Sequence, residues 1–247
     1  MNSNRSMNSD KLNNVDPSEI QKFEKLAARW WDSESEFRPL HQINPLRANW
    51  ISSKVNLAGK KVLDIGCGGG ILTEALAQRG AIVSGIDMAE ASIAVAKLHR
   101  KESKLEVDYE TTSAEKLAVD KPGEFDIVTC LEVLEHVPDP RAIITACRTL
   151  LKPSGDIFLS TINRNPKAYL FAIIGAEYIL NLLPRGTHDY QKLICPSELA
   201  SWCRTNDLSL KDQVGLGYNI FTKKYSLQKN IDVNYLAHYT SNLQLKR

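Results

Sequence analysis

The sequence predicts an α/β fold in which helices cover both faces of a mostly parallel β-sheet. From residue 60 onwards, apolar runs of strand length alternate with amphipathic runs of helix length. Strands that are separated by single helices form right-handed βαβ units and hence a parallel sheet. Directly after the first apolar run the chain reads GCGGG over residues 66–70. Glycines between a strand and a helix allow something to approach the backbone closely.

The bulk composition is that of a globular protein and excludes several classes. The 247 residues include 43% hydrophobic and 24% charged side chains, which is ordinary for a soluble domain. The formal net charge of +2 gives no basic face for nucleic acid. Five cysteines, an odd number in apolar surroundings, indicate reduced thiols and a cytoplasmic location. The polar residues 1–14 lack an apolar signal segment and predict a disordered tail, followed by a single domain over residues 15–247.

A helical extension over residues 15–58 is predicted before the sheet begins. Asp16 can cap a helix that has Pro17 at its first position and Glu19 where a capping box requires it. A second, shorter helix is predicted over residues 47–55, after Pro45.

The alternating region gives five strands and the helices between them. Strands are predicted at residues 61–65, 81–86, 105–110, 125–130 and 156–161. Helices are predicted at residues 71–79, 90–101, 140–151 and 197–205. Residues 151–155 are expected to form a turn, and residues 163–196 an apolar insertion. The last two strands, within residues 208–217 and 219–228, are expected to form an antiparallel hairpin at one edge of the sheet.

The spacing of the glycines argues against a dinucleotide site. A G-x-G-x-x-G motif starting at Gly66 would require glycine where the chain has Ile71. The pattern is instead D-x-G-x-G-x-G, starting from Asp64. A second acid, Asp87, follows the second strand, where a carboxylate can accept hydrogen bonds from both hydroxyls of a ribose. The alternative for Asp87 is capping of the helix at 90–101.

This arrangement resembles the class I S-adenosylmethionine-dependent methyltransferases, whose sheet is Rossmann-like. The resemblance implies that the glycine loop meets the amino-acid part of S-adenosylmethionine and that Met88 lies against the adenine. Cys130 and Leu131 are expected to line the other side of the cleft. Ser113 or Ala114 would meet the adenine amine.

The chain resembles the ubiquinone-biosynthesis O-methyltransferase family more specifically than the fold alone. Four stretches carry that resemblance, namely FRPLHQINPLR (37–47), VTCLEVLEHVPDP (128–140), NRNPKAYLFAIIGAEYIL (163–180) and LPRGTHDY (183–190). It implies methylation of a phenolic hydroxyl on polyprenyl catechol or demethylubiquinol intermediates. It also implies that Arg47 binds the carboxylate of the cofactor, for which a guanidinium is suited. The residues expected to bind the cofactor are then Arg47, Gly66, Cys67, Gly68, Asp87, Met88 and Leu131.

The expected chemistry requires help in removing a phenolic proton, because a phenol with a pKa near 10 is mostly protonated at neutral pH. The candidate catalytic residues are Glu132, Glu135 and His136, directly after the fourth strand. Three alternatives remain open for them. His136 can act as general base; the three can hold Mg²⁺, with which relatives are associated; or they can brace the loop.

Residues 168–183 form an apolar segment with one charge, Glu177, and basic residues on both sides. The segment is too short to cross a bilayer. It predicts either an interfacial helix that attaches the enzyme to the inner face of the membrane, or a lid over the cleft. Other partners consistent with the resemblance are further ubiquinone-biosynthesis enzymes in a complex. The competing functions are a methyltransferase of another pathway and a silent cofactor-binding module.

Overall fold

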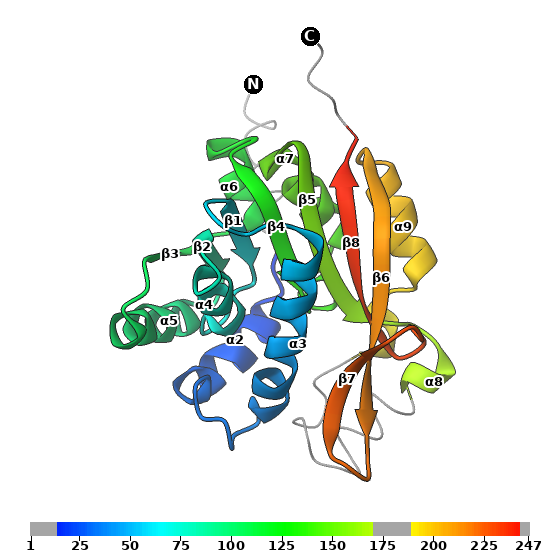
Figure 1. Ribbon diagram of the computed structural model, residues 1–247, viewed down its shortest axis with the longest axis horizontal. Helices are drawn as coiled ribbons and strands as arrows, with labels where there is room; N and C mark the ends of the chain where they lie inside the picture. The colour runs from blue at the N-terminus through cyan, green and yellow to red at the C-terminus, as the bar shows by residue number, and fades with distance from the viewer. Residues whose placement is uncertain (1–13, 170–188, 243–247) are drawn as a thin grey trace, which may run out of the picture.

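The computed structural model describes residues 14–169 and 189–242. Its centre is an eight-stranded sheet with the order β3-β2-β1-β4-β5-β8-β6-β7, shown in Figure 1. Of the predicted tail, Asn14 is described, and its side chain exchanges hydrogen bonds of 2.6 and 2.7 Å with the backbone of Asp139.

The parallel half of the sheet confirms the predicted strands. The pairs β1–β2, β2–β3, β1–β4 and β4–β5 are all parallel. The strands are β1 (Lys61–Ile65), β2 (Ile82–Asp87), β3 (Val107–Thr111), β4 (Phe125–Leu131) and β5 (Leu151–Ile162). The expected turn at residues 151–155 is wrong, because β5 already pairs with β4 at Leu151 and its register then shifts. Ser154, with φ of 59°, lies in this irregular part of the strand.

The antiparallel part contains the predicted hairpin and one strand that was not expected. The hairpin consists of β6 (Leu208–Asn219) and β7 (Lys224–Gln228). Between it and the parallel half lies β8 (Asn234–Ser241), antiparallel to both β5 and β6. Most side chains of β8 are buried on both faces, so the strand lacks the alternation of apolar and polar residues by which a half-buried strand is recognised.

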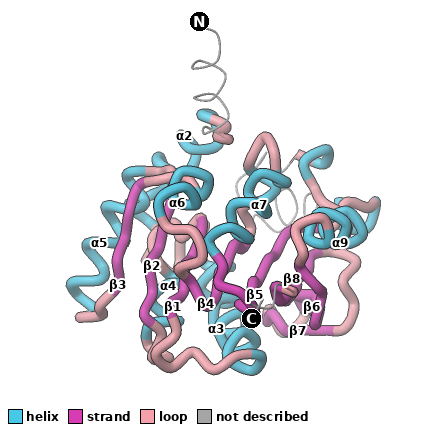
Figure 2. The backbone as a smooth tube through the Cα atoms, turned by 90° about the horizontal axis from the view of Figure 1, so that it is seen from above, coloured by secondary structure: helices cyan, strands magenta, loops and turns pink. Residues whose placement is uncertain are grey.

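Helices cover both faces of the sheet (Figure 2). On one face, side chains of α3 (Arg38–Lys54), α4 (Ile71–Ala77) and α5 (Glu90–Ser103) pack in one core. On the other face, α6 (Ala114–Asp120), α7 (Pro140–Leu150) and α9 (Pro196–Arg204) form a second core. Helix α6 was not expected; it is short, and Ser113 caps it by accepting a hydrogen bond from the Lys116 amide at 3.2 Å.

The helical extension packs over the carboxyl ends of the parallel strands and differs from its prediction in two respects. Asp16 caps α2 (Pro17–Leu26) as expected, but Glu19 does not complete a capping box, because its carboxylate contacts His136 and Lys22. The second helix, α3, begins at Arg38 and continues through Pro45. Pro45 does not end it, because the turns before and after Pro45 both bury side chains in the protein interior. The short 3₁₀ helix η1 (Ala27–Arg29) follows α2.

The apolar insertion is described only at its two ends. Helix α8 (Pro166–Ala168) and the 3₁₀ helix η4 (Tyr190–Lys192) belong to it, while residues 170–188 lie outside the described residues. In the part of the chain that the structure describes, none of the helices has the length and apolar character needed to cross a membrane. All five cysteines are free.

Candidate active site

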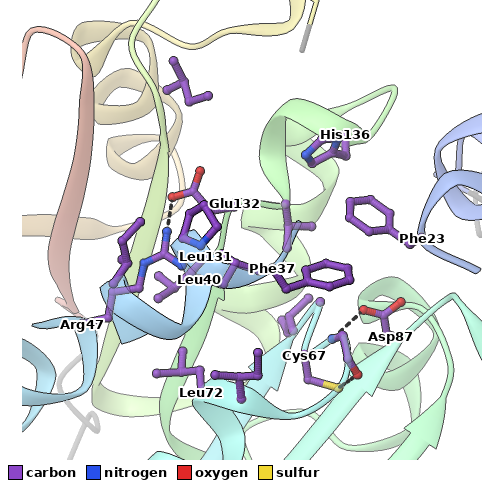
Figure 3. Close-up of a pocket in the computed structure, with 18 of the residues that line it drawn as sticks. Phe23, Phe37, Leu40, Arg47, Cys67, Leu72, Asp87, Leu131, Glu132 and His136 are labelled. Atoms are coloured by element: carbon purple, nitrogen blue, oxygen red, sulfur yellow. Dashed lines mark hydrogen bonds and ion pairs between the residues drawn. The ribbon is translucent and has the colours of Figure 1, made fainter. Parts of the chain in front are cut away.

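A cavity of about 1340 Å³ lies at the carboxyl ends of β1, β2 and β4. The helical extension lines one side of it, and the β6–β7 hairpin lines another. Figure 3 shows Asp87 and Cys67 at one end of this cavity and His136 beside Phe23 at another. The cavity therefore joins the predicted cofactor residues to the predicted catalytic loop, as expected for the switch point of an open α/β sheet.

The glycine loop between β1 and α4 is held by the helical extension as well as by the sheet. Gly66 and Gly68 have φ of 71° and 53°, backbone angles that residues with a Cβ rarely adopt. A Cβ on Gly68 would lie 2.5 Å from the ring of Trp30, and a Cβ on Gly66 would lie 2.2 Å from Val133. Trp31 Nε1 donates to the carbonyl of Gly69 at 2.9 Å. The groups that approach these glycines most closely in the structure are therefore side chains of the chain itself, Val133 at Gly66 and Trp30 at Gly68.

Asp64 ties the loop to the sheet. Its buried carboxylate accepts hydrogen bonds from Thr73 Oγ1 at 2.6 Å and Thr129 Oγ1 at 2.7 Å. Burial raises the pKa of Asp64 to about 6.

Asp87 is the last residue of β2 and lies on the cavity wall. Its carboxylate accepts hydrogen bonds from the amides of Gly68 at 2.9 Å and Ala89 at 2.8 Å. Burial raises the pKa of Asp87, and the two amides oppose that rise. Met88 and the buried Cys67 line the same part of the cavity. Asp87 thus fixes the glycine loop while its carboxylate remains on the surface that a ligand would meet.

Arg47 and Glu132 form an ion pair across the cavity wall. Arg47 Nη2 lies 2.5 Å from Glu132 Oε1, which also accepts a hydrogen bond from Ser160 Oγ at 2.8 Å. Glu132 follows β4 with φ of 55°, which is uncommon for a residue with a side chain and typical of functional turns. Arg47 is buried, and within the described residues its Nε has no hydrogen-bond partner. A buried guanidinium donor without a partner fits a site for an anionic group of a ligand.

His136 pairs with the helical extension, which the sequence did not reveal. Its Nδ1 lies 3.0 Å from Glu19 Oε2, and its ring meets Phe23 edge to face at 5.4 Å. The hydrogen bond from His136 is the main cause that lowers the pKa of Glu19 to about 2. Lys22 Nζ is 2.9 Å and Lys192 Nζ is 3.7 Å from Glu19 Oε1. The carboxylate of Glu19 is therefore shared between the imidazole and two ammonium groups.

Glu135 points away from this group. Its buried carboxyl accepts a hydrogen bond from Thr161 Oγ1 at 2.9 Å. Burial and the charge of Glu132 raise its pKa well above the ordinary value. Its Oε1 has no hydrogen-bond partner in the described part of the chain.

Two further expectations can be compared with these positions. Ser113, Ala114 and Leu131 line the cavity as expected. The expectation for Cys130 is wrong: its side chain is completely buried in the core, together with Cys147. Successive residues of a strand point to opposite faces, and Cys130 packs in the core on one face of the sheet while Leu131 packs in the core on the other.

The three predicted metal ligands do not converge on one point, because the carboxyls of Glu132 and Glu135 interact with each other while His136 pairs with Glu19. Glu132 faces Arg47, Glu135 faces Thr161 and His136 faces Glu19. Among residues 14–169 and 189–242, no group of three or more His, Cys, Asp or Glu side chains could hold a metal ion. The arrangement of these donors therefore does not fit a preformed Mg²⁺ site.

Comparisons with known proteins identify the fold and the family. Residues 63–159 match the family model described as a methyltransferase domain. The magnesium protoporphyrin IX methyltransferase of Synechocystis PCC 6803, solved with bound SAH, has a TM-score of 0.61 and 22% identity, covering 82% of this chain and 83% of that chain. The domain match and the fold are those of the class I methyltransferases.

Curated relatives identify the family more narrowly. The ubiquinone biosynthesis O-methyltransferase of Pseudomonas aeruginosa (strain LESB58) is 66% identical over 226 residues, which are 92% of this chain and 97% of the relative. That of Azotobacter vinelandii (strain DJ / ATCC BAA-1303) is 65% identical over 225 residues, 91% of this chain and 97% of the relative. The chain belongs to the ubiquinone biosynthesis O-methyltransferase family.

Proposed function

We propose that the protein transfers the methyl group of S-adenosylmethionine to a phenolic hydroxyl of a polyprenylated catechol or demethylubiquinol intermediate of ubiquinone biosynthesis. One observation carries the proposal together with the family relationship. A single cavity joins the glycine loop and Asp87 to His136 and to an apolar wall formed by Phe23, Leu26 and the β6–β7 hairpin. Cofactor, phenol and an apolar tail can therefore occupy one continuous space.

The cofactor would be held by residues whose hydrogen-bonding groups suit its ribose and its carboxylate. Asp87 would accept hydrogen bonds from the ribose hydroxyls, and Arg47 would donate its Nε–H to the carboxylate of the methionine part. Glu132 fixes the orientation of Arg47, so we assign it a positioning role. Gly66, Cys67, Gly68, Met88 and Leu131 would shape the wall around the cofactor. When bound, S-adenosylmethionine supplies an electrophilic methyl group on a positively charged sulfur.

His136 is the residue that we propose to remove the phenolic proton. When Nδ1–H donates to Glu19, the neutral imidazole carries its lone pair on Nε2, as a general base requires. Glu19 then stabilises the imidazolium that forms on proton uptake, in the way that a buried carboxylate supports a catalytic histidine. Glu135 faces Thr161 instead of the cavity, so we assign it to bracing the loop.

Magnesium remains the alternative for this loop. Its three predicted ligands would have to turn away from Arg47, Thr161 and Glu19 to meet at one point. No step of the proposed mechanism depends on magnesium. Methyl transfer to a catechol with a short prenyl chain, measured with and without EDTA, separates the two versions. Full activity in EDTA is expected; activity that returns only on addition of Mg²⁺ would favour the metal.

The decisive test combines binding and turnover. Wild-type protein should bind S-adenosylmethionine in a calorimetric titration and methylate the prenyl catechol. His136→Asn should lower kcat by about 10²–10⁴-fold and leave the Kd for the cofactor unchanged. Binding without transfer by the wild type would instead indicate a silent cofactor-binding module. Transfer to unrelated phenols but not to prenyl catechols would indicate another pathway.

Attachment to the inner face of the membrane through residues 168–183 is proposed on the sequence alone, because residues 170–183 lie outside the described residues. Its support is the apolar run with basic flanks and the lipophilic tail of the substrate. Replacement of Phe171 and Ile174 by Ser should reduce sedimentation with anionic vesicles. Unchanged sedimentation would favour the lid. A complex with other enzymes of the pathway also stays a prediction.

A further inference from the structure

The tip of the β6–β7 hairpin exposes two large apolar side chains. Phe221 is 96% exposed and Ile220 is 59% exposed. The hairpin projects from the lower end of the sheet in Figure 1. Removing apolar area of this size from water is favourable. A single exposed apolar residue is ordinary, whereas two neighbouring ones indicate a binding surface.

An ordered turn holds these two side chains in their exposed position. Asn219 Oδ1 accepts hydrogen bonds from the amides of Phe221 at 2.9 Å and Thr222 at 3.0 Å. Below the turn, Tyr218 and Tyr225 face each other across the strands with ring centroids 4.7 Å apart. The backbone thus presents Phe221 in a fixed position without any packing of its ring.

The charged residues of the segment that forms the tip are all basic. Between Gln213 and Ile231 the sequence contains Lys223, Lys224 and Lys229 and no acidic residue. All three lysines are exposed, and Lys223 and Lys224 follow Phe221 by two and three residues in the chain. Apolar side chains with flanking ammonium groups suit the boundary between anionic headgroups and acyl chains.

We propose that this tip is a membrane contact, in which Phe221 and Ile220 enter an anionic lipid surface and Lys223 and Lys224 meet its headgroups. A protein partner fits less well, because stable protein interfaces bury about 1,200–2,000 Å², far more than two side chains offer. Reversible membrane binding requires only a small apolar area together with basic residues.

The hairpin also lines the cavity, so a membrane contact at its tip would have a role in substrate entry. Tyr218, Ile220 and Tyr225 line the same cavity as Asp87 and His136. A lipid surface at the tip would therefore meet the cavity where an apolar substrate tail leaves the bilayer. This role rests on the proposed function, whereas the membrane contact itself does not require the enzyme to be active.

The test is a flotation assay of the full chain with two kinds of vesicles, phosphatidylcholine alone and phosphatidylcholine mixed with an equal part of phosphatidylglycerol. Wild type should bind the mixed vesicles, and added salt should weaken the binding. Phe221→Ser should lower the affinity about tenfold, whereas Phe221→Trp should preserve or increase it, since Trp favours the interface. Val119→Ser, at a residue that is 71% exposed on α6, is the matched control and should bind as wild type does.

The lysines are tested separately. Lys223→Gln with Lys224→Gln should reduce binding to the mixed vesicles only, by about thirtyfold if each lysine contributes about 1 kcal/mol. Lys97→Gln with Lys101→Gln, which removes the same charge from α5, should have no effect.

Several outcomes would overturn the proposal. They are equal binding by wild type and Phe221→Ser, no vesicle binding by wild type, and equal losses in the control variants. Equal binding by wild type and Phe221→Ser would still permit attachment through residues 168–183. Activity on a catechol without a tail is measured in the same preparations. If that activity is absent but binding depends on Phe221, the proposed function fails and the membrane contact stands.

Discussion

Asp64, Asp87 and Glu132 are three carboxylates whose tasks differ because their partners differ. Asp64 accepts from two hydroxyls inside the protein, Asp87 from two backbone amides at the cavity wall, and Glu132 from a guanidinium. The first connects β1 to α4 and β4, the second fixes the glycine loop, and the third orients a cation. Only Asp87 combines a structural bond with a position suited to ligand hydroxyls.

Asp87→Ala should weaken binding of S-adenosylmethionine by about 1–3 kcal/mol, because hydrogen bonds to a charged acceptor are lost. Calorimetric titration of the folded variant measures the change. Asp108→Ala, at an exposed position on β3, removes the same charge and should leave the affinity as in the wild type. An unchanged Kd for Asp87→Ala would contradict the assignment.

Asp64 should make stability fall as the pH rises. Its folded pKa of about 6 exceeds the ordinary value of 3.8, so the folded state holds a proton that the unfolded state has released. The resulting stabilisation is complete below about pH 4 and is lost as the pH rises through about 6. Urea unfolding from about pH 4 to about pH 7 should show wild type losing about 3 kcal/mol relative to Asp64→Asn. Parallel curves for the two proteins would refute this prediction.

Among the elements, the glycine loop is constrained both by positive φ and by the lack of space for a side chain. A pair of variants can distinguish these two constraints. Gly59 and Gly66 both have positive φ, 70° and 71°, but a Cβ on Gly59 meets nothing within 4 Å, whereas one on Gly66 would meet Val133 at 2.2 Å. Gly59→Ala should lower the free energy of unfolding by about 1 kcal/mol through backbone strain alone.

Gly66→Ala should cost more than Gly59→Ala, by roughly 1–3 kcal/mol for overpacking, and should also impair cofactor binding because the loop must move. Chemical denaturation and calorimetry measure the two effects. Equal costs for the two variants would show that Val133 moves aside freely.

The contact between α2 and the catalytic loop can be tested through Glu19. Because its pKa is lowered to about 2, its pairing stabilises the fold above about pH 4.5 and is lost as the pH falls through about 2. Glu19→Gln should lower the free energy of unfolding at neutral pH by about 1–3 kcal/mol. It should also lower kcat while the Kd for the cofactor stays the same, because the imidazole loses its anionic partner. Glu24→Gln, exposed on the same helix, is the control; an identical kcat in both variants would rule out a positioning role for Glu19.

For the molecule as a whole, the sequence was most informative where local pattern decides structure. The alternation after residue 60, the Asp16 cap and the edge hairpin all followed from local signals. Strand β8 did not, because it is buried on both faces, and the start of α3 did not, because tertiary packing overrides Pro45. The Glu19–His136 pair joins residues that are 117 positions apart. From the sequence alone, Glu19 is assigned to the nearest plausible partner, which is the N-terminus of its own helix.

The cofactor side of the site was more predictable than its catalytic side. Gly66, Asp87 and Leu131 were assigned to the cofactor from the family resemblance and their places at the ends of strands, and the structure places all three on one cavity. Glu132, Glu135 and His136 were expected as a group from their proximity in the chain. The left-handed backbone at Glu132 and the 3₁₀ helix η2 (Leu134–His136) turn them in different directions.

Trp30 gives the protein a built-in optical reporter. Its ring packs against Gly68 and Gly69, stacks on Phe37 at 4.0 Å and donates its Nε1–H to Ser92 at 3.1 Å. Occupation of the cavity beside this loop should change the emission of the indole without any attached dye. Titration with S-adenosylmethionine should therefore alter the intrinsic fluorescence of wild type and of Trp202→Phe, a change on distant α9. Trp30→Phe should remove most of the response, and a response that persists in Trp30→Phe would locate the signal elsewhere.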